Sequence, residues 1–143
     1  MRIVSKDEHF RESKKALMRY RALMEKVARM EDKLAQIDSD IISLKSPVSD
    51  GMPKASVRIT LDDKLIQRDE LEGKINTLLT HARKNRSDIS RCIDALDNQK
   101  QALVLDRYFI SAQSLEYIAD DIGYSRSYVT KLYVQGVQSV IVV

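Results

Sequence analysis

The sequence predicts an all-α protein, in which a long N-terminal helical hairpin or coiled coil is followed by a C-terminal helix-turn-helix domain. Three observations support this class. The 143 residues include only four glycines and two prolines, so few positions interrupt a helix. Apolar residues recur at steps of three and four through most of the N-terminal two thirds. The segment from Leu115 to Leu132 has the spacing of two short helices that cross over a tight turn.

Residues 1–45 are predicted to form a long helix that begins near Lys6 and extends to about Leu44. At about 1.5 Å per residue, this helix is roughly 57 Å long. A helix of this length cannot bury its apolar stripe against itself, so we expect it to pack on a partner helix and to serve oligomerisation. The stripe consists of Phe10, Leu17, Tyr20, Met24, Val27, Met30, Leu34, Ile37, Ile41 and Leu44.

Residues 46–60 are predicted to form an exposed loop. Both prolines, one glycine and three serines fall in this segment, and the helical periodicity stops there. Pro47 should end the first helix, and Pro53 disfavours helical backbone at Met52.

Residues 61–96 are predicted to form the second long helix, with Asp62 and Asp63 in its first turn, where negative charge suits the helix dipole. Arg68 and Asn85 are polar positions in its stripe. Either the seam frays there, or Asn85 pairs with its mate across a dimer and sets the register. The two long helices form an antiparallel hairpin, dimerise with another copy, or do both. The stripe consists of Leu61, Leu65, Arg68, Leu71, Ile75, Leu78, Ala82, Asn85, Ile89, Cys92 and Leu96.

Residues 97–143 are predicted to form the helix-turn-helix domain. Asp97 is expected to cap a helix over 98–109, and Ser114 and Ser125 to cap the two helices of the turn unit. The last helix should reach about Ser139 and leave an apolar tail.

The turn unit itself requires particular residue types. Ala119 is small enough for a close helix crossing, and Gly123, four residues later, favours the positive φ that the turn needs. The predicted structural core of this unit comprises Ile118, Ala119, Ile122, Gly123, Val129 and Leu132.

The last helix has an outward face that suits double-stranded DNA. If Val129, Leu132, Gly136 and Val137 face inward, then Arg126, Ser127, Thr130, Lys131 and Val134 face outward. Arg126 is the candidate for bidentate contact with guanine, Ser127 and Thr130 are placed for base edges or phosphate, and Lys131 is placed for phosphate. The predicted DNA-binding residues are Ser125, Arg126, Ser127, Tyr128, Thr130 and Lys131, with Ser125 at the positive end of the helix.

The alternative for this face is an ordinary solvated helix surface, because residues 100–143 contain four Lys or Arg against four Asp or Glu. Glu116, Asp120 and Asp121 are expected on the first helix of the unit, which lies above the groove rather than in it. With so few cations, a single copy has little affinity for phosphate. We therefore expect a homo-oligomer, a dimer or larger, whose linked DNA-binding domains act together.

Composition argues against an enzyme and against a membrane protein. Cys92 is the only cysteine, is expected to be a small buried residue, and fits a reducing cytoplasm. His9 and His81 have no metal-ligand spacing, the glycines form no phosphate loop, and no catalytic residues, metal or cofactor are predicted. No apolar run is long enough to span a membrane, and the N-terminus does not resemble a secretory signal.

The C-terminal stretch also resembles region 4 of bacterial sigma factors. The matching residues are Val104, Leu105, Arg107 and Tyr108 of a VL-x-x-RY helix, followed by Ser114, Ile118, Ala119, Ile122, Gly123 and Ser125 of the turn unit. The whole chain resembles ArpU- and RinA-type regulators of late phage and prophage transcription. A loop of the form SP-x-x-x-GMP carries this resemblance, through Ser46, Pro47, Gly51, Met52 and Pro53.

This resemblance implies a phage-encoded DNA-binding transcriptional regulator, an activator of late packaging and lysis genes, in the cytoplasm of a bacterial host. Two alternatives stay open: a sigma-like adaptor that binds host RNA polymerase, and a DNA-packaging component similar to a small terminase subunit. The sequence departs from the family at its end, where Gly136 interrupts the last helix. The apolar tail from Val140 to Val143 then suggests an added self-association surface.

Overall fold

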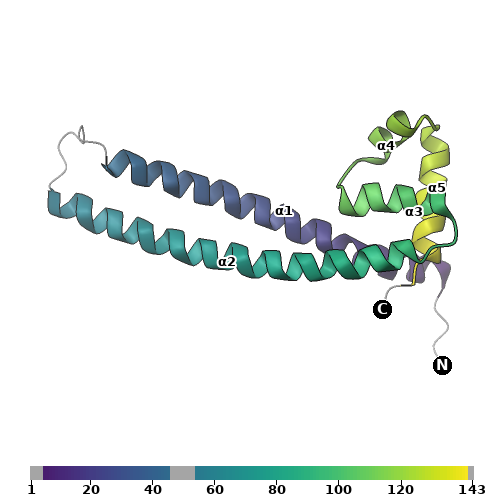
Figure 1. Cartoon of the computed structure of the whole chain (residues 1–143), viewed down its shortest axis with the longest axis horizontal. Helices are drawn as coiled ribbons and strands as arrows, with labels where there is room; N and C mark the ends of the chain where they lie inside the picture. The colour runs from purple at the N-terminus through teal and green to yellow at the C-terminus, as the bar shows by residue number, and fades with distance from the viewer. Residues whose placement is uncertain (1–4, 46–53, 142–143) are drawn as a thin grey trace, which may run out of the picture. The chain divides into compact units, whose positions relative to one another are not determined.

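A computed structural model describes residues 5–45 and 54–141, and over these residues the chain is helical and contains no strand (Figure 1). The predicted all-α class with two long N-terminal helices is confirmed. Two compact units divide the chain: unit 1 comprises residues 1–23 and 82–143, and unit 2 comprises residues 24–81. The elements are α1 (Lys6–Lys45), α2 (Lys54–Asp94), α3 (Gln99–Leu105), a single π turn η1 (Asp106–Ile110), α4 (Leu115–Ile122) and α5 (Arg126–Ser139).

Unit 2 is an antiparallel pair of helices, formed by the second part of α1 and the first part of α2 (Figure 1). Its buried apolar residues are Val27, Ile41 and Ile75. Among the described residues, two ion pairs join the helices: Lys64 Nζ lies 3.3 Å from Asp40 Oδ2, and Arg68 Nε lies 2.6 Å from Asp38 Oδ1. The hairpin is therefore made within one chain, and pairing with another copy stays a prediction.

Arg68 does not fray the seam. Its guanidinium bridges Asp38 on α1 and Glu72 on its own helix, with Nη1 3.1 Å from Glu72 Oε2. These carboxylates raise the pKa of Arg68, with Asp38 the stronger influence. Leu65, predicted in the stripe, is exposed instead, and Lys64 takes the inner position to reach Asp40.

The start of α2 corrects the predicted loop over 46–60. Residues 46–53 lie outside the described part of the chain, but 54–60 are helical, and the Thr60 hydroxyl donates to the Ser56 carbonyl at 2.9 Å. A proline restricts the residue before it and leaves the residues after it free to enter a helix. Asp62 and Asp63 consequently lie in the helix interior rather than in the first turn, so their predicted role at the helix dipole was wrong.

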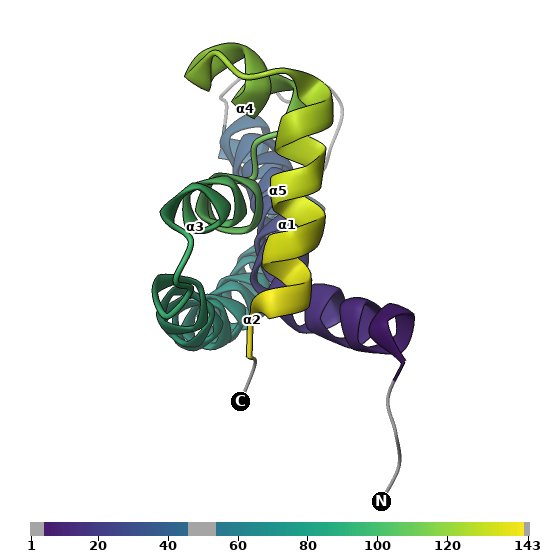
Figure 2. The same ribbon diagram turned by 90° about the vertical axis from the view of Figure 1, so that its right-hand side faces the viewer.

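Unit 1 has a layered core in which α3 and α4 both pack against α5 (Figure 2). Aromatic rings fill its centre. Tyr133 stacks on Phe109 at a centroid distance of 5.9 Å and meets Tyr108 and Phe10 edge to face. Burial and the neighbouring Tyr108 phenol raise the pKa of Tyr133 to about 12. The fully buried side chains around these rings include Leu17, Ile93, Val104, Leu105, Ile118, Val129, Val137 and Val140.

Gly136 does not interrupt the last helix, contrary to the prediction. It lies inside α5, where a Cβ atom would be 3.1 Å from both Cγ and Cδ1 of Leu105. The glycine permits a close approach of α5 to α3, and the buried face of α5 holds the helix together through that packing.

The helix before the turn unit also differs from its prediction. Asn98, not Asp97, caps α3, and its side chain accepts from the backbone N–H groups of Lys100 and Gln101. Either residue type is a good cap, and the backbone at Asn98 has the extended conformation that a cap requires. After Leu105 the helix widens into η1, whose closing bond is donated by Ser111 N–H to the Asp106 carbonyl at 3.2 Å.

Candidate nucleic-acid interface

The turn between α4 and α5 has the caps and the backbone conformation that the sequence predicts. The Ser114 hydroxyl accepts from Tyr117 N–H at 3.1 Å and starts α4. At the other end Gly123 has φ of 77°, and the N–H groups of Gly123 and Tyr124 both donate to the Ala119 carbonyl. Ala119 is fully buried beneath this turn, so the two helices approach closely.

The start of α5 is equally well defined. The Ser125 hydroxyl accepts from Tyr128 N–H at 3.2 Å, and Val129 and Leu132 are buried one and two turns further along the helix. Of the six predicted core residues, four are buried, Ile122 is half-buried, and Gly123 is exposed because it forms the turn itself.

The six predicted DNA-binding residues are brought together on the first two turns of α5, and all of them are exposed: Ser125, Arg126, Ser127, Tyr128, Thr130 and Lys131. Val134, predicted on the same outward face, is half-buried against the core. It lies beside Tyr133 and one turn before Val137, both buried, so the outward face is shorter than the sequence suggested.

Arg126 is not a free cation. Its Nη2 atom lies 2.8 Å from Glu116 Oε1 and 4.0 Å from Asp120 Oδ2, both on α4. The Arg126 side chain is still 63% exposed, which keeps it accessible to a ligand. An anion that binds Arg126 must therefore displace carboxylates that are largely solvated, and exposed pairs of this kind contribute little stability.

One sequence signal could have pointed to this pairing. Glu116 and Asp120 are four residues apart and so share one face of α4. Which residue that face meets depends on the crossing of α4 over α5, so the spacing alone does not identify Arg126 as the partner.

Arg107 is a second residue whose role the sequence did not reveal. Its guanidinium pairs with Asp121 of α4, its Nε donates to Gln113 Oε1 at 2.7 Å, and its side chain is only 17% exposed. It also lies 6.0 Å from the centroid of the Tyr117 ring. Arg107 thus joins η1 to α4 and orients the helix that crosses α5.

Exposed aromatic rings border the predicted DNA-binding face. Tyr124 and Tyr128 meet edge to face at 5.1 Å, and Lys100 Nζ lies 5.6 Å from the centroid of the Tyr124 ring. Tyr128 was predicted for this face, whereas Tyr124 and Lys100 were not. Lys100 belongs to α3, and only the packing of α3 in the folded unit brings it close to the turn.

Metal-binding and membrane-spanning features are both absent from the described chain. Among residues 5–45 and 54–141, no three His, Cys, Asp or Glu side chains are grouped so that they could hold a metal ion. Within the same ranges, no helix combines the length and apolar character needed to cross a membrane. Cys92, predicted to be buried, is half-buried and packs on the edge of the unit 1 core.

The candidate interface therefore consists of a capped turn, an exposed polar helix start with one internally paired arginine, and a border of tyrosines. The chain matches no protein-family model, no curated protein and no solved structure.

Proposed function

We propose that this chain is a sequence-specific binder of duplex DNA, in which α4 and α5 act as a helix-turn-helix unit and the start of α5 enters the major groove. The observation that carries this proposal is the division of α5 into two faces. Val129 and Leu132 are buried, while Ser127, Thr130 and Lys131 on the same turns are exposed. A recognition helix needs this division together with an accessible N-terminal end.

The exposed residues have distinct roles in this proposal. Arg126 donates to the two acceptors of a guanine after it leaves Glu116, and Ser127 and Thr130 donate to or accept from neighbouring base edges. Lys131 neutralises phosphate, and the backbone N–H groups that follow Ser125 donate to a second phosphate at the positive end of α5.

The biological role in this proposal comes from the sequence resemblance. A DNA-binding unit joined to a helical hairpin fits a phage-type regulator of transcription, and the ArpU- and RinA-type regulators supply the specific expectation of late-gene activation. Residues 100–143 are charge-balanced. Affinity at physiological salt then requires at least two linked copies on one site, and this makes a homo-oligomer part of the proposal.

The decisive experiment selects bound sequences from random duplexes and then measures affinities by fluorescence anisotropy. Arg126→Ala should reduce discrimination between the selected and a scrambled duplex by about 1–3 kcal/mol, whereas Lys131→Ala should weaken both duplexes equally. Lys74→Ala, an exposed change in unit 2, is the control and should alter neither value. The absence of any enriched duplex at low salt would refute the proposal. In that case co-purification with RNA polymerase would favour a sigma-like adaptor, and a ring-sized assembly would favour a packaging component.

A further inference from the structure

The C-terminal part of α2 carries an exposed basic surface that the predicted interface does not include. Residues 82–94, which belong to unit 1, contain four Lys or Arg against two Asp. All four cations are exposed. Arg91 pairs with Asp88 at 2.8 Å, but no carboxylate in the described part of the chain pairs with Arg83 or Arg86. Two arginines here are therefore available to an external anion, unlike Arg126.

Three of these cations and two serines surround a shallow hollow of about 370 Å³. The lining residues, which we call the α2 basic surface, are Arg83, Arg86, Ser87, Ser90 and Arg91. A guanidinium can bind two phosphate oxygens at once, and a serine hydroxyl donates a further hydrogen bond. This combination of donors suits a phosphodiester.

The composition of the segment favours the backbone of a duplex over other anionic partners. No aromatic residue occurs in 82–94, so no ring is available to stack on the bases of a single strand. Its isoleucines, Ile89 and Ile93, are buried in the core, so neither is available to enter a lipid surface. The exposed donors of this segment therefore suit the phosphates of a duplex backbone rather than bases or lipid.

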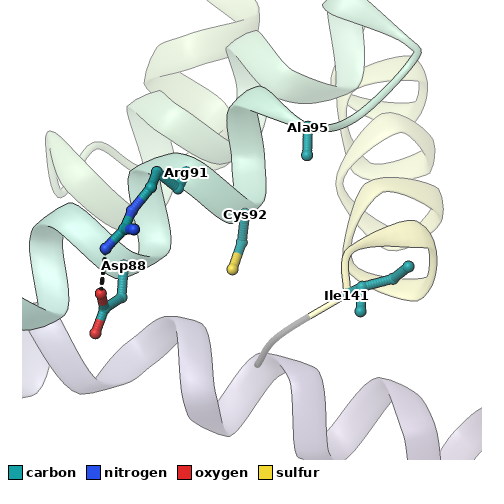
Figure 3. Close-up of a pocket in the computed structure, with 5 residues that line it drawn as sticks. All are labelled: Asp88, Arg91, Cys92, Ala95 and Ile141. Carbon is teal, nitrogen blue, oxygen red and sulfur yellow. Dashed lines mark hydrogen bonds and ion pairs between the residues drawn. The ribbon is translucent and has the colours of Figure 1, made fainter.

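The α2 basic surface lies toward the opposite end of α5 from the predicted base contacts. Ile141, which follows α5, lines a pocket with Asp88, Arg91, Cys92 and Ala95, as Figure 3 shows. The 14 residues of α5 span roughly 21 Å. This length is less than one turn of B-DNA, about 34 Å. A duplex that follows the direction of α5 from its start would therefore meet the α2 basic surface within one of its turns.

We infer that the α2 basic surface binds the phosphate backbone of the same duplex whose bases the start of α5 reads. The inference rests on the proposed function. It assigns phosphate neutralisation, which α5 supplies only weakly, to arginines that lie about 40 positions earlier in the sequence and in the same compact unit.

The test compares the salt dependence of binding to a 20-bp duplex for the original protein and for Arg83→Gln/Arg86→Gln. Loss of two phosphate contacts should make the slope of log K against log salt shallower by about 1.8, and should lower affinity at 0.1 M salt by about 10–100-fold. Both positions are exposed and Gln is a good helix former, so thermal unfolding should be unchanged. Lys54→Gln/Arg58→Gln in unit 2 changes the net charge equally, is the matched control, and should retain the original slope.

A second variant separates charge from geometry. Arg83→Lys/Arg86→Lys should retain the slope, because an ammonium also neutralises phosphate, while it loses affinity through the missing bidentate bonds. An unchanged slope in the Gln variant, with the original protein bound to the duplex, would overturn this inference and leave the proposed function intact. If the original protein bound no duplex, the proposed function would fail first. The same variants are also measured with a single-stranded RNA probe. If the Gln variant lost affinity for the RNA and kept its affinity for the duplex, the surface would be assigned to RNA and the inference would be overturned as well.

Discussion

Individual residues at the turn combine a structural and an electrostatic task. Gly123 supplies a left-handed backbone conformation that ends α4, and Ser125 starts α5 two residues later. Between them the chain reverses over Ala119. Because Arg126 is the first residue of α5, this tight reversal also brings its guanidinium to the carboxylates of α4. The geometry that exposes the predicted DNA-binding face therefore also pairs its arginine with carboxylates, which compete with any external anion.

Gly123 should be the least replaceable residue of the turn. At φ of 77°, an alanine side chain is strained, so Gly123→Ala should lower the free energy of unfolding by about 1–2 kcal/mol. Gly123→Asn should cost less, because asparagine tolerates the left-handed region. Chemical denaturation of the two variants measures the difference, and equal losses would show that backbone strain is not the cause.

Glu116 should lower the affinity of the protein for DNA. Glu116→Gln removes the carboxylate 2.8 Å from Arg126 and should strengthen binding to the selected duplex by roughly 3–10-fold, with little effect on stability because the pair is exposed. Glu72→Gln on α2 of unit 2 removes a carboxylate from another arginine and serves as the control. A gain that persists in an Arg126→Ala background would mean that Glu116 simply repels phosphate.

Tyr133 should make the protein sensitive to alkaline pH. Its buried hydroxyl has no hydrogen-bond partner among the described residues, and its pKa is raised to about 12. Since the unfolded chain loses this proton near pH 10, its contribution to stability is complete below pH 10 and declines toward pH 12, by about 1–2 kcal/mol. Chemical denaturation of Tyr133→Phe and of the original protein at pH 8 and pH 11 tests this. At pH 8 the variant should be at least as stable as the original protein, and its free energy of unfolding should fall less between pH 8 and pH 11. A decline as steep as in the original protein would place the titration elsewhere.

Among the helices, the boundaries depend mainly on local sequence, whereas the contacts depend on how the helices pack. The heptad-like stripe of α1 is enough to predict its extent. The predicted start of α2 is too late, because proline restricts the residue before it and the helix can begin directly after Pro53. Gly136 illustrates the same limit. By its local propensity it weakens a helix, but in the fold it lies against Leu105 and sets the distance between α3 and α5.

Two helical glycines should therefore respond oppositely to the same substitution. At Gly73 of α2 no atom lies within 4 Å of the position that a Cβ would take, so Gly73→Ala should stabilise the protein by about 0.5–1 kcal/mol through helix propensity. Gly136→Ala gains the same propensity but forces a methyl group against the fully buried Leu105, and should be destabilising by about 1 kcal/mol. Thermal unfolding of both variants gives the comparison, and a stabilised Gly136→Ala would show that α3 and α5 can move apart at little cost.

Across the whole molecule, the two units differ in charge and in burial. Unit 1 contains 15 Lys and Arg against 10 Asp and Glu, whereas unit 2 contains nine against eleven. Among the described residues, unit 2 has three buried apolar side chains, and most of the core belongs to unit 1. Unit 1 is thus both the better-packed part and the part suited to a polyanion.

This difference predicts unequal local stability. Amide hydrogens of unit 2 should exchange about tenfold or more faster than those of the α3 and α5 core, because a two-helix pair with few buried contacts opens readily. Hydrogen exchange followed by mass spectrometry at low protein concentration measures this. Protection of unit 2 that rises with concentration would show that a second copy covers it, as the expected homo-oligomer requires. Equal protection of both units at every concentration would contradict the prediction.

Local sequence is sufficient to predict the helical class, the extent of α1, the caps Ser114 and Ser125, and the left-handed turn at Gly123. These features depend on periodicity and on local backbone preferences, which neighbouring residues decide. Three other features come from tertiary packing alone: Arg126 meets Glu116, Arg107 joins η1 to α4, and the arginines of α2 belong to the same compact unit as the turn. Such pairings join residues on different elements, and their partners depend on how the helices cross, which no local pattern specifies.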